Sequence, residues 1–422
     1  MCALFAGALA VAGLPRMLSS EAVGFTQGQA GSRLGGLPLP PAPPGAAGLS
    51  QARLVEATDL LKRFVAEQKI AGAVAGVARR GTLAYLEAVG LQDVAARTPM
   101  TTDSMFRIYS MTKPITAVAV MMLHEEGRFR LDDPVSKYLP EFKDVMVAVP
   151  GRAARRPSRE ITVADLLLHT SGLNHRTSEQ YRTAQIRSRS DSLPQFVTKI
   201  TRAPLMEDPG TTYRYSESPT VLGRLVEIWS GKPFDVFLNE RVFAPLGMSD
   251  TMFWVGPEHR AQLTTVYAAA KGGGLTPTEL EVMPFTERGA LMEGAVGLVS
   301  TVPDFLRFSQ MLLNKGELRG VRLLRPETVD RMVANGLSDA VLAARGGGMG
   351  WGLGNVNVVM NPEELNYPAN RGEYGWDGSA GTIFWIDPSL ELVSVLMWQS
   401  VPANPDSLRQ RFKTIVHQAL VN

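Results

Sequence analysis

The sequence predicts an α/β protein of the α+β type, in which one antiparallel sheet is built from both ends of the chain and flanked by helices. Strand-like segments occur near residues 71–90 and return at 382–399. Between them, residues 106–285 consist mostly of helix-like stretches that Pro and Gly interrupt. We therefore expect an α/β domain formed by residues 50–105 and 286–422, an inserted, mainly helical domain, and a functional site between the two.

The composition excludes several classes of protein. The chain has 422 residues, of which 45% are hydrophobic and 20% charged, so it is large enough to form a core without disulfides or metals. The net charge of +2 provides no general attraction to nucleic acid or to acidic membranes. The single cysteine, Cys2, and five scattered histidines form no disulfide framework and no zinc-binding pattern. We expect a small-molecule partner, no nucleic acid, no metal and no cofactor, and the oligomeric state stays open.

Residues 1–49 are expected to form an amino-terminal extension. Residues 3–14 are an apolar run that is shorter than the ~20 residues a membrane-spanning helix needs, so we expect no stable membrane insertion. The run resembles the core of a secretory signal, but no Lys or Arg precedes it. A cytoplasmic location is therefore favoured, and a periplasmic or secreted one follows if residues 1–25 act as a signal peptide. Residues 28–49 are rich in Gly, Pro and Ala, which favour extended, weakly packed backbone.

The elements of the α/β domain follow from local patterns. Ser50 is a suitable cap for a helix whose apolar face carries Leu54 and Phe64. The two strands on either side of Arg80 and Gly81 indicate a hairpin.

The carboxyl end returns to strands. Residues 382–388 and 390–399 are expected to form two strands joined by a Pro-Ser turn, and a helix is expected from Asp406 to about Leu420. Strands at both ends of the chain are what one sheet closed by the two termini requires.

Ser110 and Lys113 lie three residues apart at the start of a helical pattern that runs to about Glu126 and ends at Gly127. This spacing places both side chains on one face of the helix, and a serine in the first turn lies at the positive end of the helix dipole. The helix is apolar almost all round, so it is expected to be buried, and burial lowers the pKa of a lysine toward the neutral form that a base requires. Ser110 and Lys113 are either a nucleophile and its base, or a helix-capping serine beside a surface lysine.

Two further segments bear on that choice. Tyr215 follows a Pro-Gly turn and precedes an apolar helix, so its phenol serves either as a proton shuttle or as an ordinary buried donor. Gly375, Gly378 and Gly381 surround Trp376 in front of a strand, which indicates either backbone that approaches a ligand closely or a Gly-rich turn.

Together these motifs resemble the serine beta-lactamase and penicillin-binding superfamily, and most closely its esterase branch, the family VIII carboxylesterases related to class C beta-lactamases. The resemblance covers about residues 50–420 and includes the segments 166–173 and 297–318. It implies a beta-lactamase/transpeptidase-like fold.

The resemblance also implies roles for particular residues. Ser110 is similar to the acylated nucleophile of that family, and Lys113 and Tyr215 are similar to its proton-transfer pair. The backbone amides of Ser110 and Ser379 correspond to the oxyanion hole, whereas His169 corresponds to a structural histidine in the core.

The sequence departs from the family pattern at three single positions and in residues 292–298, which replace a more Gly-rich segment. Trp376 stands where beta-lactamases and transpeptidases have a lysine that binds the substrate carboxylate, and an aromatic side chain cannot pair with a carboxylate. Asp377 stands where esterase relatives often have glycine, and we expect it to narrow the pocket or to form a salt bridge. Glu217 takes the third position of a Tyr-x-Asn motif, and its carboxylate is expected to hold Lys113 protonated and to shift the role of base toward Tyr215. The candidate substrate-pocket residues are Trp376, Asp377, Gly378 and Glu217.

The expected function is hydrolysis of short-chain carboxylic esters through an acyl-enzyme on Ser110, with weak cephalosporin hydrolysis as a side activity. The alternatives on the same fold are a class C-like beta-lactamase or DD-peptidase and an acyltransferase. The chain has no G-x-S-x-G motif, which disfavours an α/β-hydrolase. Further candidate walls of the acyl pocket are residues 176–196, Met252 and Phe253.

Overall fold

A computed structural model describes residues 37–270, 273–280 and 285–421. The described residues all belong to one compact unit. The predicted apolar run at 3–14 and the proposed signal peptide lie outside the described residues.

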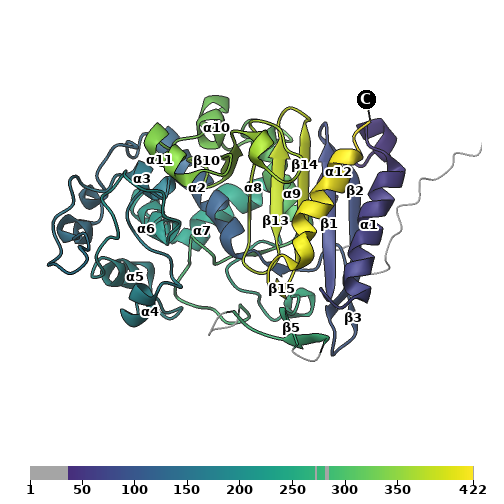
Figure 1. Cartoon of the computed structure of the whole chain (residues 1–422), viewed down its shortest axis with the longest axis horizontal. Helices are drawn as coiled ribbons and strands as arrows, with labels where there is room; N and C mark the ends of the chain where they lie inside the picture. Colours follow the sequence, from purple (N-terminus) through teal and green to yellow (C-terminus); the bar gives the residue numbers. More distant parts are fainter. Residues whose placement is uncertain (1–36, 271–272, 281–284, 422) are drawn as a thin grey trace, which may run out of the picture. The chain divides into compact units, whose positions relative to one another are not determined.

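The centre of this unit is an antiparallel sheet of eight strands (Figure 1). Strand β1 lies between β2 and β14, and Ala73 of β1 is paired with Trp398 of β14, so strands from both ends of the chain meet in the middle of the sheet. The predicted fold class is therefore confirmed. In spatial order the strands are β10 (Met349–Trp351), β11 (Asn357–Val359), β12 (Tyr374–Asp377), β13 (Ile383–Asp387), β14 (Leu392–Trp398), β1 (Gly72–Arg79), β2 (Thr82–Asp93) and β3 (Thr98–Pro99).

Helices cover both faces of the sheet. Helices α1 (Gln51–Ala66) and α12 (Leu408–Gln418) pack together on one face, where they share a core with alternate residues of β1 such as Ala75. Helix α9 (Val302–Leu313) packs on the other face against β1 and β14. Gly76 is needed there, because a Cβ atom at this position would lie 2.7 Å from the Leu306 side chain of α9. The period of two along β1 thus divides the core between the two faces.

Local signals set most boundaries of these elements. The Ser50 side chain accepts a hydrogen bond from the amide of Arg53 and caps α1, as predicted. The hairpin turns at Arg80 and Gly81, both of which have positive φ. Helix α12 begins at Leu408, two residues later than expected, after a single 3₁₀ turn.

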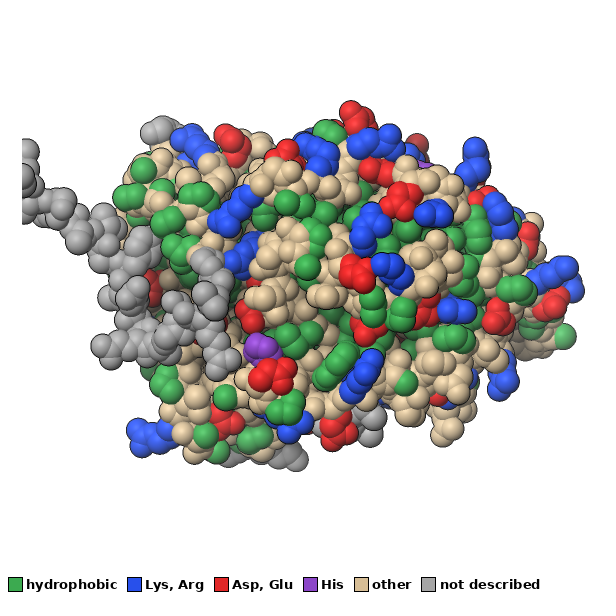
Figure 2. Space-filling model, turned by 180° about the vertical axis from the view of Figure 1, so that it is seen from behind, with side chains coloured by type: hydrophobic (Ala, Val, Ile, Leu, Met, Phe, Trp, Pro, Cys, Tyr) green, Lys and Arg blue, Asp and Glu red, His purple; other side chains and the backbone are tan. Residues whose placement is uncertain are grey.

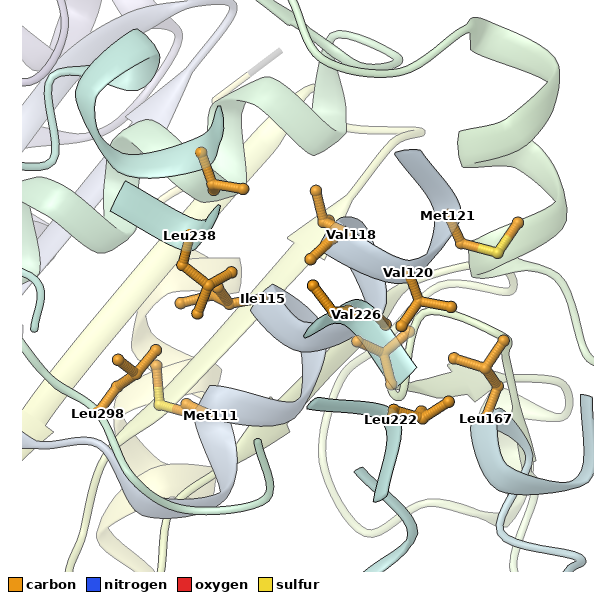
Figure 3. Close-up of a cluster of buried hydrophobic side chains, with 14 of the residues drawn as sticks. Met111, Ile115, Val118, Val120, Met121, Leu167, Leu222, Val226, Leu238 and Leu298 are labelled. Atoms are coloured by element: carbon orange, nitrogen blue, oxygen red, sulfur yellow. The ribbon is translucent and has the colours of Figure 1, made fainter. Parts of the chain in front are cut away.

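The segment between the strands is mostly helical and irregular. Its longest helices are α2 (Thr112–Glu125) and α6 (Ser218–Ser230), and Figure 3 shows α2 side chains such as Ile115 and Val118 packed against Val226 of α6. Short strands also occur in it, since β5 pairs in parallel with β15 from the end of the chain. The boundaries 106–285 for a separate helical domain stay a proposal. The other elements of this segment are α3 (Val163–Leu167), α4 (Glu179–Thr183), α5 (Leu193–Ile200), α7 (Phe234–Leu238), α8 (Ala244–Leu246), β4 (Phe106–Arg107), β5 (Tyr267–Ala269) and β6 (Leu275–Pro277).

The remaining elements follow in the second half of the chain. They are β7 (Val299–Ser300), β8 (Glu317–Leu318), β9 (Val321–Arg322), α10 (Pro326–Val333), α11 (Asp339–Arg345) and β15 (Ser400–Val401).

The packed chain begins earlier than Ser50. The amide of Ala42 donates to the Leu83 carbonyl of β2, and Leu39 and Leu49 are buried. Composition predicted extended, weakly packed backbone here, but the buried leucines fix the segment against the rest of the fold, and it includes a 3₁₀ turn at Pro44–Ala47.

The surface carries charges of both signs. On the face shown in Figure 2, Lys and Arg side chains alternate with Asp and Glu, and no large area of one sign gathers on its described part. None of the helices in the described ranges combines the length and the apolar character that crossing a bilayer requires.

Candidate active site

Ser110 lies in a 3₁₀ turn, Tyr109–Met111, that leads directly into α2. Sequence reasoning placed it in the first turn of the α-helix, so the structure moves it just outside that turn. Tyr109 adopts φ +42°, a left-handed conformation that is strained for a large side chain, and its ring is buried edge-on against Phe285. This packing fixes the backbone immediately before Ser110.

Lys113 projects from the first turn of α2 toward Ser110. Its Nζ lies 3.3 Å from the Ser110 Oγ and donates to the Ala295 carbonyl at 2.9 Å. The side chain is completely buried, and this burial lowers its pKa to about 7 although the carboxylate of Glu217 acts in the opposite direction. Lys113 therefore has a substantial neutral fraction near neutral pH, which is the form that can accept a proton.

Tyr215 completes a group of three around the Ser110 hydroxyl. Its phenol pairs with Ser110 and accepts a hydrogen bond from the Trp376 Nε1 at 3.1 Å. The Lys113 Nζ lies 4.5 Å from the centre of the Tyr215 ring. Burial raises the pKa of Tyr215 well above its usual range, so the phenol stays protonated. Tyr215 can therefore pass a proton on, but it does not rest as a phenolate.

The turn between β12 and β13 lies against the loop that carries Ser110. A Cβ atom on Gly378 would come within 2.5 Å of the Ile108 carbonyl oxygen, so only glycine allows this approach. The Thr382 hydroxyl donates to the same carbonyl at 3.4 Å. Ser379 occupies the exposed tip of the turn, and among the described residues its backbone amide has no hydrogen-bond acceptor.

Glu217 lies at the amino-terminal end of α6 and is completely buried. Its Oε1 lies 3.8 Å from the Arg176 Nη1, which with Lys113 keeps the pKa of Glu217 below its ordinary value although burial opposes this. Glu217 raises the pKa of Lys113, as predicted, but burial of Lys113 lowers this pKa by more. The pKa values thus favour Lys113 over Tyr215 as the resting base.

Comparisons with known proteins identify the family. The model of the beta-lactamase family matches residues 57–418. The chain belongs to the beta-lactamase family. It is 32% identical over 355 residues to esterase EstB of Burkholderia gladioli, an alignment that covers 78% of this chain and 86% of that protein.

Two solved structures resemble this beta-lactamase-family protein. EstCE1, titled a hydrolase with promiscuous acyltransferase activity, superposes with a TM-score of 0.76 at 26% identity and covers 88% of this chain and 99% of its own. A class C beta-lactamase from Rhodobacter sphaeroides superposes with a TM-score of 0.64 at 21% identity, over 86% and 98% of the two chains, which shows the shared fold. The resemblance to the esterase branch of the superfamily is therefore confirmed.

Aromatic side chains form one wall beside Tyr215 in this beta-lactamase-family protein. Trp376 meets Trp351 edge to face at 4.6 Å between ring centres, and His175 stacks on Tyr215 at 5.7 Å. Neither Trp351 nor His175 was found from the sequence, although the Gly-rich surroundings of Trp351 are a signal of close packing. His169 is fully buried, and its Nδ1 lies 3.0 Å from the Ser216 hydroxyl, as suits a structural role.

The other predicted pocket walls have different positions. Phe253 is buried against Phe234 and against Gly297, so it belongs to the core. Met252 is bridged to Val299 of β7. The segment 176–196 begins beside the site, because Arg176 reaches Glu217.

Asp377 forms the salt bridge that was one of the two expectations for it. Its Oδ2 accepts from the Arg409 Nη1 of α12 at 2.7 Å. The side chain thus points to the C-terminal helix and is held there.

One group among the described residues has the composition of a metal site. Glu373, Asp387 and His417 each bring a ligand atom within 4.8 Å of the others. The ammonium of Lys413 already pairs with Glu373, and Asp387 accepts from the Asn370 side-chain amide at 2.6 Å. These partners describe a buried ion-pair network that ties α12 to the sheet, and it offers no reactive role at Ser110.

Proposed function

We propose that this protein is a serine carboxylesterase that hydrolyses short-chain carboxylic esters through an acyl-enzyme on Ser110. The observation that carries the proposal is the position of the Ser110 hydroxyl, which contacts both the Nζ of the buried Lys113 at 3.3 Å and the phenol of Tyr215. A nucleophile that contacts both a partly neutral amine and a protonated phenol supports a route for proton transfer. The similarity to esterase EstB supports the choice of ester substrates.

The proposed reaction has two balanced halves. In acylation, the Ser110 oxygen attacks the ester carbonyl while its proton passes to the Lys113 amine, and Tyr215 relays a proton to the departing alkoxide. The backbone amides of Ser110 and Ser379 stabilise the oxyanion, each such donor contributing about 3 kcal/mol in comparable sites. In deacylation, water attacks the acyl group, gives its proton to the same pair and releases the acid, and the proton returns to the Ser110 oxygen.

The aromatic wall supports uncharged esters over beta-lactams. A beta-lactam carries a carboxylate that needs a cation, and Trp376 with its hydrogen bond to Tyr215 supplies none at that position. Arg409, whose guanidinium also donates to the Gly378 carbonyl of this turn, is already paired with Asp377. Turnover of nitrocefin is therefore expected to be slower than that of p-nitrophenyl butyrate, and the reverse order would favour a class C-like beta-lactamase or a DD-peptidase.

The test of the nucleophile compares two buried serines. Ser110→Ala is expected to abolish hydrolysis of p-nitrophenyl acetate and butyrate. Ser309→Ala is the matched control, because Ser309 is fully buried in α9 and its hydroxyl has no hydrogen-bond partner among the described residues. Activity of the Ser110→Ala variant above about one tenth of the wild type would overturn the proposal, since removal of a serine nucleophile costs several orders of magnitude.

A covalent label identifies the same residue independently. After reaction with an alkyl phosphonate ester, mass spectrometry of the peptides is expected to show the added mass on Ser110. A label on another serine would contradict the assignment.

Acyl transfer is the second candidate, because EstCE1 is titled a hydrolase with promiscuous acyltransferase activity. An alcohol that enters in place of water would release an ester instead of an acid. Product analysis with and without added alcohol separates the two, and a new ester as the main product would favour transfer.

A further inference from the structure

The guanidinium of Arg409 holds the turn between β12 and β13 from behind. Arg409 is the second residue of α12, the C-terminal helix that Figure 1 shows across the sheet. Its Nη1 donates to Asp377 at 2.7 Å, and its Nη2 donates to the carbonyl of Gly378 at 2.8 Å and of Thr382 at 3.3 Å. One planar guanidinium group therefore forms hydrogen bonds to both arms of a single turn.

The turn also has backbone hydrogen bonds of its own. The amide of Gly378 donates to the carbonyl of Thr382 at 2.8 Å, the amide of Gly381 donates to the carbonyl of Gly378 at 3.3 Å, and the amide of Ser400 in β15 donates to the carbonyl of Ala380 at 2.8 Å. Ser379 at its tip is exposed, and Gly381 has φ +112°, a conformation that only glycine adopts freely. None of these bonds is made by Ser379 itself among the described residues, so the orientation of its amide depends on how the two arms of the turn are held.

Arg409 is itself well fixed. Its side chain is largely buried, and its backbone amide donates to the Asn404 side chain at 3.0 Å. Its guanidinium carbon also lies 5.8 Å from the centre of the Trp398 ring in β14. Arg409 thus links the turn to the C-terminal helix α12 and to strand β14 in the middle of the sheet.

We propose that Arg409 is a positioning residue that, with Asp377 as its counter-charge, sets the backbone amide of Ser379 for the oxyanion. This inference rests on the proposed function, in which that amide stabilises the tetrahedral intermediate. It gives Asp377 a role that the sequence alone did not: the carboxylate orients the guanidinium, so that the remaining donors meet the two carbonyls. An oxyanion donor must lie within a few tenths of an ångström of its optimal position. Loss of the Arg409 hydrogen bonds is therefore expected to destabilise the transition state more than it weakens substrate binding.

The experiment compares three variants of the full chain. Arg409→Met removes every donor while it keeps an unbranched side chain, and Arg409→Lys keeps the charge but cannot span Asp377 and both carbonyls. Arg411→Met is the matched control: Arg411 lies on the same helix, is exposed, and packs over the Phe64 ring at 5.1 Å, away from the turn. Rates with p-nitrophenyl butyrate are divided by the number of competent sites, which is counted by phosphonate labelling of Ser110 at its end point.

The expected result is a split between the two kinetic constants. Arg409→Met lowers kcat per competent site by about 10- to 100-fold, less than the 10²–10³ that deletion of an oxyanion donor costs, and it changes KM by less than about threefold. Arg409→Lys falls between this variant and the wild type. Arg411→Met keeps kcat within about twofold, since nothing that it contacts reaches the turn.

Three outcomes separate the explanations. If Arg409→Met has fewer competent sites but an unchanged kcat per site, Arg409 only stabilises the fold and the inference is overturned. If Arg409→Met and Arg411→Met lower kcat equally, the effect comes from the helix and the inference is again overturned. If the wild type itself hydrolyses no ester, the proposed function fails, and the rate of phosphonate labelling, which also requires the oxyanion hole, then tests the position of the turn alone.

Discussion

The indole Nε1 of Trp376 donates a hydrogen bond to the phenol oxygen of Tyr215 at 3.1 Å. The phenol oxygen accepts this bond through a lone pair and also pairs with Ser110, so its own hydrogen is not used by the indole. Trp376 therefore does two things at once: its ring lies beside Tyr215 as a wall of the site, and its N–H binds the phenol that we propose relays protons.

Replacement of Trp376 by Phe separates these two contributions. Trp376→Phe keeps an aromatic wall but loses the donor, so kcat for p-nitrophenyl butyrate is expected to fall by about 10-fold, the equivalent of one ordinary hydrogen bond, with a smaller change in KM. Trp229→Phe is the control, because the Trp229 ring is buried against Phe129 and its Nε1 has no partner among the described residues. Equal kcat in the two variants would show that the indole N–H has no part in the reaction.

The pH dependence reports the charge around Lys113. Since Lys113 must be neutral to accept a proton and its pKa is about 7, kcat/KM is expected to rise with pH through about 7 and then to level off. The Glu217 carboxylate raises the pKa of Lys113. Glu217→Gln removes this effect, so the midpoint of the rise is expected at lower pH than in the wild type.

The comparison needs a control for general changes in charge. Glu317→Gln serves, because Glu317 pairs with Arg322 in the exposed β8–β9 hairpin. An unchanged or higher midpoint in the Glu217→Gln variant, measured on protein shown to be folded by circular dichroism, would contradict the role of Glu217.

The buried Lys113 is expected to lower the stability of the protein. Its pKa falls from 10.5 in the unfolded chain to about 7 in the folded one, so the unfolded state binds more protons between these values and stability rises with pH across that range. The cost near pH 7 is on the order of 4 kcal/mol. Lys113→Met is therefore expected to melt at a higher temperature than the wild type at pH 7, and the difference is expected to shrink as the pH approaches 10.

Scanning calorimetry of both proteins across this range checks the trend. Lys137→Met provides the opposite case, because the exposed Lys137 has a pKa raised by its hydrogen bond to Asp133 and its loss is expected to lower the melting temperature slightly. If the Lys113→Met variant is no more stable than the wild type at pH 7, burial of Lys113 does not destabilise the folded protein and the prediction is wrong.

Gly378 is expected to tolerate no side chain. In Gly378→Ala the new methyl group would lie 2.2 Å from the Thr382 hydroxyl and 2.5 Å from the Ile108 carbonyl, so the turn must move away from Ser110. Loss of activity by at least about 10²-fold is expected, comparable to loss of one oxyanion donor. Gly45→Ala, with nothing within 4 Å of the added atom, is expected to keep full activity, and equal activity of the two variants would remove the turn from the mechanism.

The sequence was most informative where a local pattern decides the structure. The hairpin at Arg80 and Gly81, the Ser50 cap and the spacing of Ser110 and Lys113 each depend on a few neighbouring residues, and the structure places them as expected. The fold class followed from strand-like segments at both ends. The short strands β10 and β11 could not be found in this way, because each has three residues and is formed only by pairing with its neighbours.

The parts of the site that depend on tertiary contacts were not predicted. The Ala295 carbonyl accepts a hydrogen bond from Lys113, but it is a backbone group, so no side chain in the sequence marks it. His175 and Arg409 have ordinary local surroundings, and only the folded chain brings them beside Tyr215 and the turn after β12. Burial and Glu217 were both expected to change the pKa of Lys113, but in opposite directions. Only the structure shows that burial has the larger effect.

The position of β1 between β2 and β14 has a consequence for synthesis on the ribosome. The first strand of the sheet must wait for a neighbour that is translated more than 300 residues later, as the pairing of Ala73 with Trp398 requires. Until then the edge of β1 is open to wrong partners, and the turn after β12 has no helix α12 behind it. Ser110 is therefore synthesised long before the sheet is complete, and under the proposed function the enzyme becomes competent only when β14 and α12 have folded onto the strands made first.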